Sequence, residues 1–312
     1  MTSEQGGNTP IVAGVDSSEA ALHAVRWAAA TAILHRAPLH LVYAAGFPDL
    51  YVGETIQPPE SFREELRKQG WEFLRTAEAA AREAGKVDIH SRFETDPPIQ
   101  VLLGVSASAR MLVLGSSGRT GLTGLIVGST TLAMVSHARC PVVSVRGDYP
   151  DVPARDRRPV VVGIDGSPLS ERAIGYAFDE AAFRGVDLVA VHTWSDADNE
   201  VFSQARMYYD WEPMRDVEER RLAERLAGWQ QDYPDVKVTR VLVQDKPRRE
   251  LLEWSGKAQL VVVGSRGRGG FRGMLLGSTS QALVHRAECP VLIVRPDKNT
   301  TTGAARGTDE RV

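Results

Sequence analysis

The sequence predicts an α/β protein that contains two copies of an open parallel sheet with helices on both faces. Two observations predict this class. A set of motifs recurs at a constant spacing, so that Gly163 follows Gly14 by 149 residues and Gly264 follows Gly115 by the same number. Within each copy, short β-branched apolar runs alternate with amphipathic segments, which is the pattern of parallel strands joined by right-handed helical crossovers.

Each copy is expected to contain five strands and four helices in alternation. The strands of the first copy are predicted at 10–16, 39–44, 87–93, 111–115 and 141–146, and those of the second at 159–165, 188–193, 236–242, 260–264 and 290–295. Helices are predicted over 21–33 and 173–182, over 60–85 and 213–231, over 98–108 and 247–256, and from Ser129 and Ser278 onwards. The copies are expected to form two domains, 9–147 and 157–296, with flexible termini at 1–8 and 297–312.

The composition is typical of a soluble globular protein. The 312 residues suffice for about two domains of ordinary size, with 43% hydrophobic and 25% charged residues. A net charge of −3 disfavours a dedicated nucleic-acid binder, which is usually basic. The first ten residues, "MTSEQGGNTP", lack the features of a signal peptide, and the apolar runs are too short to span a bilayer. Because only two cysteines occur, Cys140 and Cys289, we expect a cytoplasmic protein with inert core thiols and no disulfide framework.

The most informative motif is a long glycine loop that follows the fourth strand of each copy. It is "GSSGRTGLTGLIVGS" over 115–129 and "GSRGRGGFRGMLLGS" over 264–278. Glycine lets backbone N–H groups approach a ligand without a Cβ in the way, and several such amides form a nest for an anion. The loop leads into the start of a helix, whose free amides add positive potential. We therefore expect a polyphosphate to bind here, outside the carboxyl ends of the strands.

The second loop carries more positive charge than the first. It contains Arg266, Arg268 and Arg272, whereas the first loop retains Arg119 at the position that corresponds to Arg268. The second site is therefore predicted to bind a polyanion more tightly at low salt.

Two structural interpretations compete with ligand binding. The glycines could form only a tight turn, but a turn needs one or two glycines, whereas three glycines and a serine of the loop recur at one spacing. Asp16 and Asp165, which follow the first strand of each copy, could be helix N-caps, and so could Ser129 and Ser278. An N-cap role and ligand contact can coexist.

The combination of a G-x2-G-x9-G-S loop with a preceding "G-[VI]-D-x-S" loop resembles the universal stress protein family, and both copies match. Neither loop ends in the Gly-Lys-Ser/Thr of a Walker A motif, and no dinucleotide-binding fingerprint follows a first strand. The resemblance covers roughly residues 9–147 and 157–296. It implies a tandem protein of the ATP-binding subclass, with strand order 3-2-1-4-5 and two nucleotide sites.

The resemblance implies a role for each matching residue. Asp16 and Asp165 are expected at the ribose and adenine, with Ala13, Val162, Ala44 and Thr193 along the adenine, and the glycines and serines at the phosphates. The first ATP site would contain Ala13, Asp16, Ala44, Gly115, Gly118, Arg119, Gly128, Ser129 and Thr130. The second would contain Val162, Asp165, Thr193, Gly264, Arg266, Gly267, Arg268, Gly277, Ser278 and Thr279. Mg²⁺ could accompany the ATP, but no protein metal site and no catalytic group are predicted.

We therefore expect a regulator of stress or growth that responds to ATP and is recognised by a partner protein. Slow ATP hydrolysis or autophosphorylation, with Ser116, Ser117, Thr120 or Ser265 as acceptors, is an alternative. A scaffold that binds nucleic acid through "RDRR" (155–158) and "KPRR" (246–249) is a second. The last strands of the copies could pair within the chain as a pseudo-dimer, and two chains could form a homodimer.

Overall fold

The computed structural model describes residues 9–46, 59–116, 127–146, 156–193, 212–243, 246–268 and 275–296. Ten strands form one sheet in the order β3-β2-β1-β4-β5-β10-β9-β6-β7-β8. The strands of the first half are β1 (Ile11–Val15), β2 (Leu39–Ala44), β3 (Ile89–Glu94), β4 (Met111–Gly115) and β5 (Val142–Val145). Those of the second half are β6 (Val160–Ile164), β7 (Leu188–Thr193), β8 (Val238–Val243), β9 (Leu260–Gly264) and β10 (Val291–Val294). Within each half all pairs are parallel and the order is 3-2-1-4-5, as predicted.

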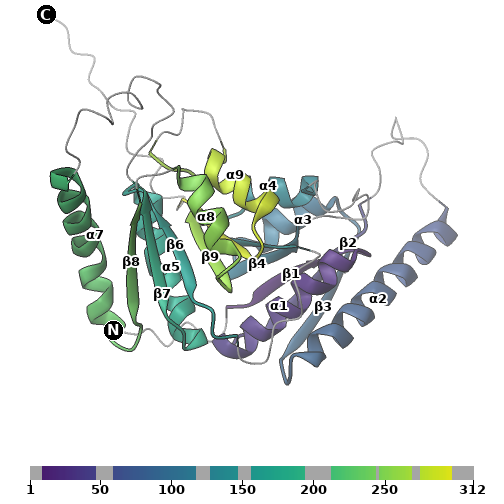
Figure 1. Ribbon diagram of the computed structural model, residues 1–312. Coiled ribbons are helices and arrows are strands. Elements are labelled where there is room, and N and C mark those ends of the chain that lie inside the picture. The colour runs from purple at the N-terminus through teal and green to yellow at the C-terminus, as the bar shows by residue number, and fades with distance from the viewer. Residues whose placement is uncertain are drawn as a thin grey trace, which may run out of the picture.

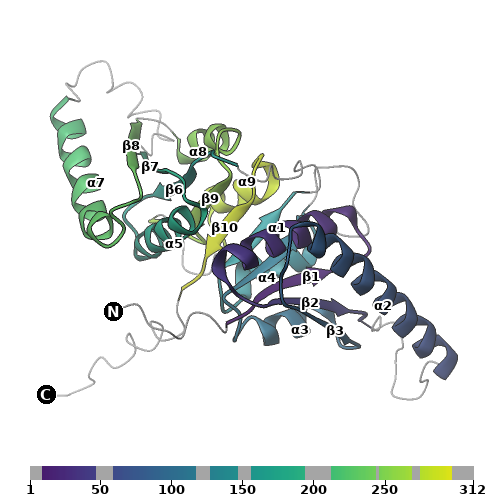
Figure 2. The same ribbon diagram turned by 90° about the horizontal axis from the view of Figure 1, so that it is seen from below.

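Helices cover both faces of each half (Figures 1 and 2). The first half contains α1 (Glu19–His35), α2 (Glu60–Glu83), α3 (Pro98–Val105) and α4 (Ser129–His137). The second half contains α5 (Pro168–Arg184), α7 (Glu212–Asp232), α8 (Pro247–Ser255) and α9 (Ser278–Arg286). Helix α1 packs beside α2 and α3 beside α4, and in the same way α5 packs beside α7 and α8 beside α9. In Figure 1, α2 and α7 lie at opposite ends of the molecule, near the edge strands β3 and β8. In the described part of the chain, no helix is long and apolar enough to cross a membrane.

The two predicted sheets are joined into one, because β5 pairs with β10 in antiparallel fashion. Val143 lies opposite Leu292 and Val142 opposite Ile293, and all four side chains are fully buried. The expectation that the last strands pair within the chain is therefore confirmed, and the pairing joins the two five-stranded parallel sheets edge to edge. The pairing removes two strand edges that would otherwise be exposed to other chains.

Local sequence signals explain where the first helix of each half begins and ends. Ser18 and Ser167 are the N-caps of α1 and α5, and each hydroxyl accepts a hydrogen bond from the backbone N–H three residues on. Both helices end in a left-handed residue, Arg36 (φ 52°) and Gly185 (φ 63°). The Asp residues of the preceding turns are therefore not the N-caps that one interpretation of the sequence proposed.

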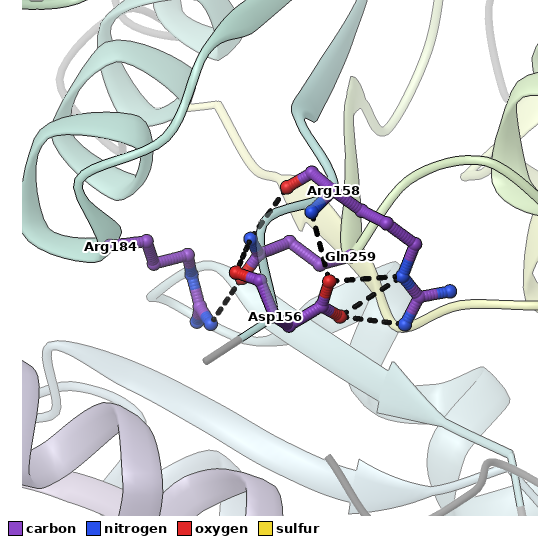
Figure 3. A network of polar contacts seen from close by, with 4 residues as sticks. All are labelled: Asp156, Arg158, Arg184 and Gln259. Carbon is purple, nitrogen blue, oxygen red and sulfur yellow. Dashed lines mark hydrogen bonds and ion pairs between the residues drawn. The ribbon is translucent and has the colours of Figure 1, made fainter. Parts of the chain in front are cut away.

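The segment that enters the second half is held by a polar network (Figure 3). The Gln259 side-chain amide donates to the backbone carbonyls of Asp156 (3.1 Å) and Arg158 (2.6 Å), and its oxygen accepts from Arg184 (3.2 Å). The guanidinium of Arg158 pairs with the carboxylate of Asp156 at 2.7 Å. The described part of the "RDRR" segment thus contributes to the fold, which argues against a role as a free basic patch.

Candidate functional site

Two cavities lie at the carboxyl ends of the strands, one in each half. In each half the first and fourth strands are neighbours, β1 with β4 and β6 with β9, and the strand order reverses between them. The cavities open at these points, which is where open α/β sheets bind ligands. Because β5 and β10 are antiparallel, the two carboxyl edges face opposite ways along the joined sheet. The two sites, called site 1 and site 2 below, are therefore separate.

Site 2 is the larger cavity, with a volume of about 440 Å³. Its walls come from the turn after β6, the end of β7, the glycine loop and the start of α9. The predicted residues that line it are Asp165, Thr193, Gly264, Arg266, Gly267, Arg268, Gly277, Ser278 and Thr279. Residues that lie about a hundred positions apart in the sequence thus meet around one cavity, as the motif pairing predicted.

Site 1 has the same construction and a volume of about 270 Å³. The predicted residues that line it are Asp16, Ala44, Gly115, Gly128, Ser129 and Thr130. Gly118 and Arg119 lie outside the described residues, as does Arg272 of the second loop.

Ala13 and Val162, which were predicted to lie along the adenine, are not among the residues that line the cavities. Both are fully buried in strands that are covered on both faces. The following residues, Gly14 and Gly163, line the sites instead. The prediction missed a further wall, which is apolar and comes from the short helices α3 and α8: Pro98 and Leu102 in site 1, and Pro247 and Leu251 in site 2.

The helices that start at the glycine loops have no side-chain caps. The N-caps of α4 and α9 are Gly128 and Gly277, and neither makes a side-chain capping bond. Ser129 and Ser278 are therefore the first helical residues and not caps, contrary to one interpretation of the sequence. The hydroxyls of Thr131 and Ser280 each donate to the last carbonyl of the preceding strand at 2.7 Å, which fixes the helix against the sheet. This leaves the first turn of each helix facing its cavity, a favourable place for an anion.

Asp165 connects the two loops of site 2. Its Oδ1 accepts a hydrogen bond from the Ser167 N–H and its Oδ2 accepts one from the Arg268 N–H, both at 2.9 Å. Burial acts to raise the pKa of Asp165, but the hydrogen bonds from Ser167 and Arg268 outweigh burial and hold the pKa below its usual value. The carboxylate is therefore ionised and fixed in place. In site 1, Asp16 Oδ1 accepts from the Ser18 N–H at 2.8 Å.

The electrostatic environment of the site 2 glycine loop is cationic. Arg266 and Arg268 line the cavity, and Arg295 lies behind the loop. Burial, assisted by the positive charge of Arg266, lowers the pKa of Arg295 to about 10. An anionic ligand in this cavity would relieve the mutual repulsion of these arginines.

Two lining residues of site 2 were not predicted as functional, namely His192 on β7 and Glu218 on α7. His192 Nε2 lies 3.1 Å from Glu218 Oε2, and both side chains are about nine-tenths buried. His192 was detectable, because it directly precedes Thr193 at the end of a strand. Glu218 carries no such signal, since α7 reaches the cavity only through tertiary packing.

The serines proposed as acceptors for autophosphorylation are poorly placed where the structure describes them. Ser265 is 0% exposed and Ser116 is 8% exposed, so neither hydroxyl is accessible to a transferred phosphoryl group. Ser117 and Thr120 lie outside the described residues.

The comparison with known protein families agrees with this architecture. The model of the universal stress protein family matches residues 7–146 and again residues 156–295. The chain belongs to this family. It is a tandem universal stress protein, since one match falls on each half of the joined sheet.

Relatives cover almost the whole chain. A universal stress protein of Mycobacterium tuberculosis is 42% identical over 289 residues, which is 91% of this chain and 96% of the relative. One of Mycolicibacterium smegmatis is 42% identical over 293 residues, 92% of this chain and 97% of that protein. Among solved structures, a universal stress protein of Archaeoglobus fulgidus superposes with a TM-score of 0.65 at 18% identity, covering 92% of this chain and 98% of that one. At this identity the superposition establishes the fold.

Proposed function

We propose that this universal stress protein binds ATP at two sites, one in each half, and acts as a nucleotide-dependent regulator in the cytoplasm. The observation that carries the proposal is the convergence at site 2. Asp165, the glycine backbone of the loop, two arginines and the uncapped start of α9 surround one cavity of about 440 Å³. This volume lies within the range of cavities that hold cofactor-sized ligands.

The walls of the cavity suit the different parts of a nucleotide. The glycine loop and the first turn of α9 supply backbone N–H groups for phosphate oxygens. Arg266 and Arg268 supply positive charge beside them, which favours a polyphosphate over a monophosphate. At the other end, Thr193, Pro247 and Leu251 offer the mostly apolar surface that a base requires.

Within the described ranges, the chain supplies no cage of acidic and histidine side chains for Mg²⁺ at this site. In the described residues, no group of three or more His, Cys, Asp and Glu side chains is placed to hold a metal ion. Both oxygens of Asp165 already accept backbone hydrogen bonds. The proposal therefore involves no step through a protein-bound metal.

The same geometry favours a switch over a turnover enzyme. A kinase or fast ATPase needs a positioned base for the attacking group. Among the described residues, the carboxylates that line site 2 are already engaged, Asp165 by backbone N–H groups and Glu218 by His192 and Arg221. We infer that bound ATP shifts the population of conformations at the carboxyl edges and that a partner protein reads this shift.

A matched pair of substitutions tests the two sites separately. Ser129→Glu and Ser278→Glu place a carboxylate in the first turn of α4 and α9, where it stabilises the helix but repels phosphate. By titration calorimetry, wild-type protein freed of bound nucleotide should bind two ATP per chain, with site 2 the tighter. Each variant should lose its own site, with affinity reduced roughly tenfold or more, and retain the other.

Two results would contradict the proposal. One is that the wild type binds no ATP; the other is that both variants bind as the wild type does. Phosphate release measured in the same samples distinguishes binding from hydrolysis, and we expect none above the rate of the buffer.

A further inference from the structure

We propose that His192 and Glu218 couple ATP binding at site 2 to the binding of a proton. Site 2 should therefore bind ATP more tightly at acidic than at alkaline pH, and site 1 should not show this dependence. The inference rests on the proposed function. It concerns two residues that line site 2 and have no ionic counterpart in site 1.

The pair is built into the wall of the cavity. His192 lies on β7 beside Thr193, and Glu218 reaches the same place from α7. Their side chains are 7% and 10% exposed. A histidine and a carboxylate that are buried to this extent interact strongly, because little water screens them.

The hydrogen bonds determine which atoms carry protons. His192 Nδ1 lies 2.8 Å from the carbonyl oxygen of Ile164, which can only accept, so Nδ1 carries a proton. Glu218 Oε1 accepts a 2.6 Å hydrogen bond from Arg221, as an ionised carboxylate does. The remaining contact, 3.1 Å from His192 Nε2 to Glu218 Oε2, requires one proton between the two atoms, and with Glu218 ionised that proton is on Nε2. The proposal assigns the arrangement in which both His192 nitrogens donate to the nucleotide-bound state of site 2.

Loss of that proton changes both the contact and the charge of the cavity. A neutral Nε2 would direct its lone pair at a carboxylate oxygen, and the wall would become more negative by one charge. The charged groups near His192 are Glu218 and Arg221 on α7, Asp165 after β6, and Arg266 and Arg268 in the glycine loop. The neighbouring position on β8 is Leu242, and α8 contributes Pro247 and Leu251, all of them apolar. A polyanionic ligand therefore binds the protonated state more tightly.

The described lining of site 1 has no such pair of histidine and glutamate side chains. The residue 149 positions before His192 is Tyr43, which packs against Phe73 and Phe93. The facing residue of α2 is Gly70, where a Cβ would lie 3.0 Å from the Tyr43 ring. In the described lining of site 1, Asp16 and Tyr43 are the ionisable residues. The wall of site 1 near α2 is therefore aromatic, whereas the corresponding wall of site 2, near α7, is ionic.

The test measures the ATP dissociation constant of each site at about pH 6 and about pH 9, a range that spans the usual titration of histidine. Ser129→Glu isolates site 2 and Ser278→Glu isolates site 1, which corrects for the titration of ATP itself. Relative to site 1, site 2 should weaken roughly fivefold to tenfold at the higher pH, the effect of one nearby charge.

Glu218→Gln gives the decisive comparison. A glutamine amide can donate to a neutral His192 Nε2, so the wall keeps its shape and loses its dependence on a proton. In the Ser129→Glu background, the Glu218→Gln variant should show the same pH profile as site 1. Glu219→Gln, on the exposed side of α7, is the matched control and should retain the profile of site 2.

The outcomes separate the two proposals. Absence of ATP binding at both sites at every pH would contradict the proposed function itself. Binding at site 2 with the pH profile of site 1, or a profile that Glu218→Gln leaves unchanged, would overturn this inference alone. In the wild type, ¹⁵N NMR of labelled histidine should show both nitrogens of His192 protonated at neutral pH, and a neutral ring would also overturn it.

Discussion

At site 2 a single carboxylate lies against the backbone of the glycine loop. A Cβ added to Gly267 would lie 2.3 Å from Asp165 Oδ2, far inside contact distance. The same oxygen accepts the hydrogen bond from the next N–H, that of Arg268. The glycine is thus required for close approach between two loops that are distant in the sequence.

Gly267→Ala tests this contact. The methyl group must displace Asp165 or the loop, so ATP affinity at site 2 should fall roughly tenfold or more while site 1 is unaffected. Calorimetry in the Ser129→Glu background measures the change. Gly228→Ala is the control, since nothing lies within 4 Å of its added Cβ in α7. That variant should gain up to about 1 kcal/mol in unfolding free energy and bind ATP normally. Equal affinities for the two variants would show that the contact is irrelevant.

At this scale most of the residues predicted for the sites line the cavities, but many other lining residues were not predicted. The repeated spacing identified the glycines, serines and Asp residues, because backbone approach to a ligand restricts residue type. It placed Ala13 and Val162 along the adenine, whereas the next residues, Gly14 and Gly163, line the cavities. A strand buried on both faces shows no alternation from which to choose between such positions. It also left the roles of Asp165 and Ser278 open between capping and ligand contact. The structure excludes the N-cap role for both, and ligand contact stays a prediction.

The helices and strands were predictable to within a few residues. The segment predicted over 60–85 is α2 (Glu60–Glu83), and that predicted over 213–231 is α7 (Glu212–Asp232). The third strands begin two residues later than expected, at Ile89 and Val238. These edge strands are only partly buried, so their apolar pattern is weaker than that of the central strands.

Burial next to the last strand of each half also explains why the two cysteines are unreactive. Cys140 and Cys289 lie two residues before the starts of β5 and β10, and both are buried. Burial raises the pKa of each thiol to about 12, so both are protonated and inert at neutral pH. This agrees with the sequence-based expectation of structural core thiols.

At the scale of the whole molecule, the two halves are joined by a buried ionic cluster in addition to the β5–β10 pairing. Glu180 of α5 lies 3.0 Å from His35 Nε2 of α1 and 3.1 Å from the guanidinium of Arg184. Arg184 also donates to Thr31 of α1 at 3.0 Å and stacks over Trp27. Burial acts to raise the pKa of Glu180, but Arg184 and then His35 outweigh it, and the net shift is downward.

The cluster makes the joint between the halves sensitive to acid. A carboxyl group with a depressed pKa contributes stability that is complete above its unfolded pKa of about 4.3 and is lost as the pH falls through the folded value. Glu180→Ala should cost about 3–5 kcal/mol at neutral pH, because it leaves Arg184 buried without its carboxylate. Urea unfolding at several pH values measures both effects.

The matched control is Glu253→Ala, which removes an exposed partner of Arg249 at 3.8 Å. Its cost should be below about 1 kcal/mol. A loss of stability in Glu180→Ala no larger than in this control would refute the role of the cluster.

The joined sheet also restricts which conformational changes ATP binding can cause. The motif repeat predicted two copies but not that Thr31, His35, Glu180 and Arg184 meet, because side chains on different helices are brought together only by the pairing of β5 with β10. With the halves fixed at the centre, we expect ATP to act on the loops at the two carboxyl edges and not by separating the halves.

The most direct test of the central claim is to denature freshly purified protein and quantify the released nucleotides by mass spectrometry. A ligand present at a thousand times its dissociation constant stabilises a fold by about 4 kcal/mol, so retention through purification is expected. The account predicts ATP at about two per chain in the wild type and less in Ser278→Glu, because that variant weakens binding at the tighter site. Finding no nucleotide, together with no thermal shift in millimolar ATP, would contradict it.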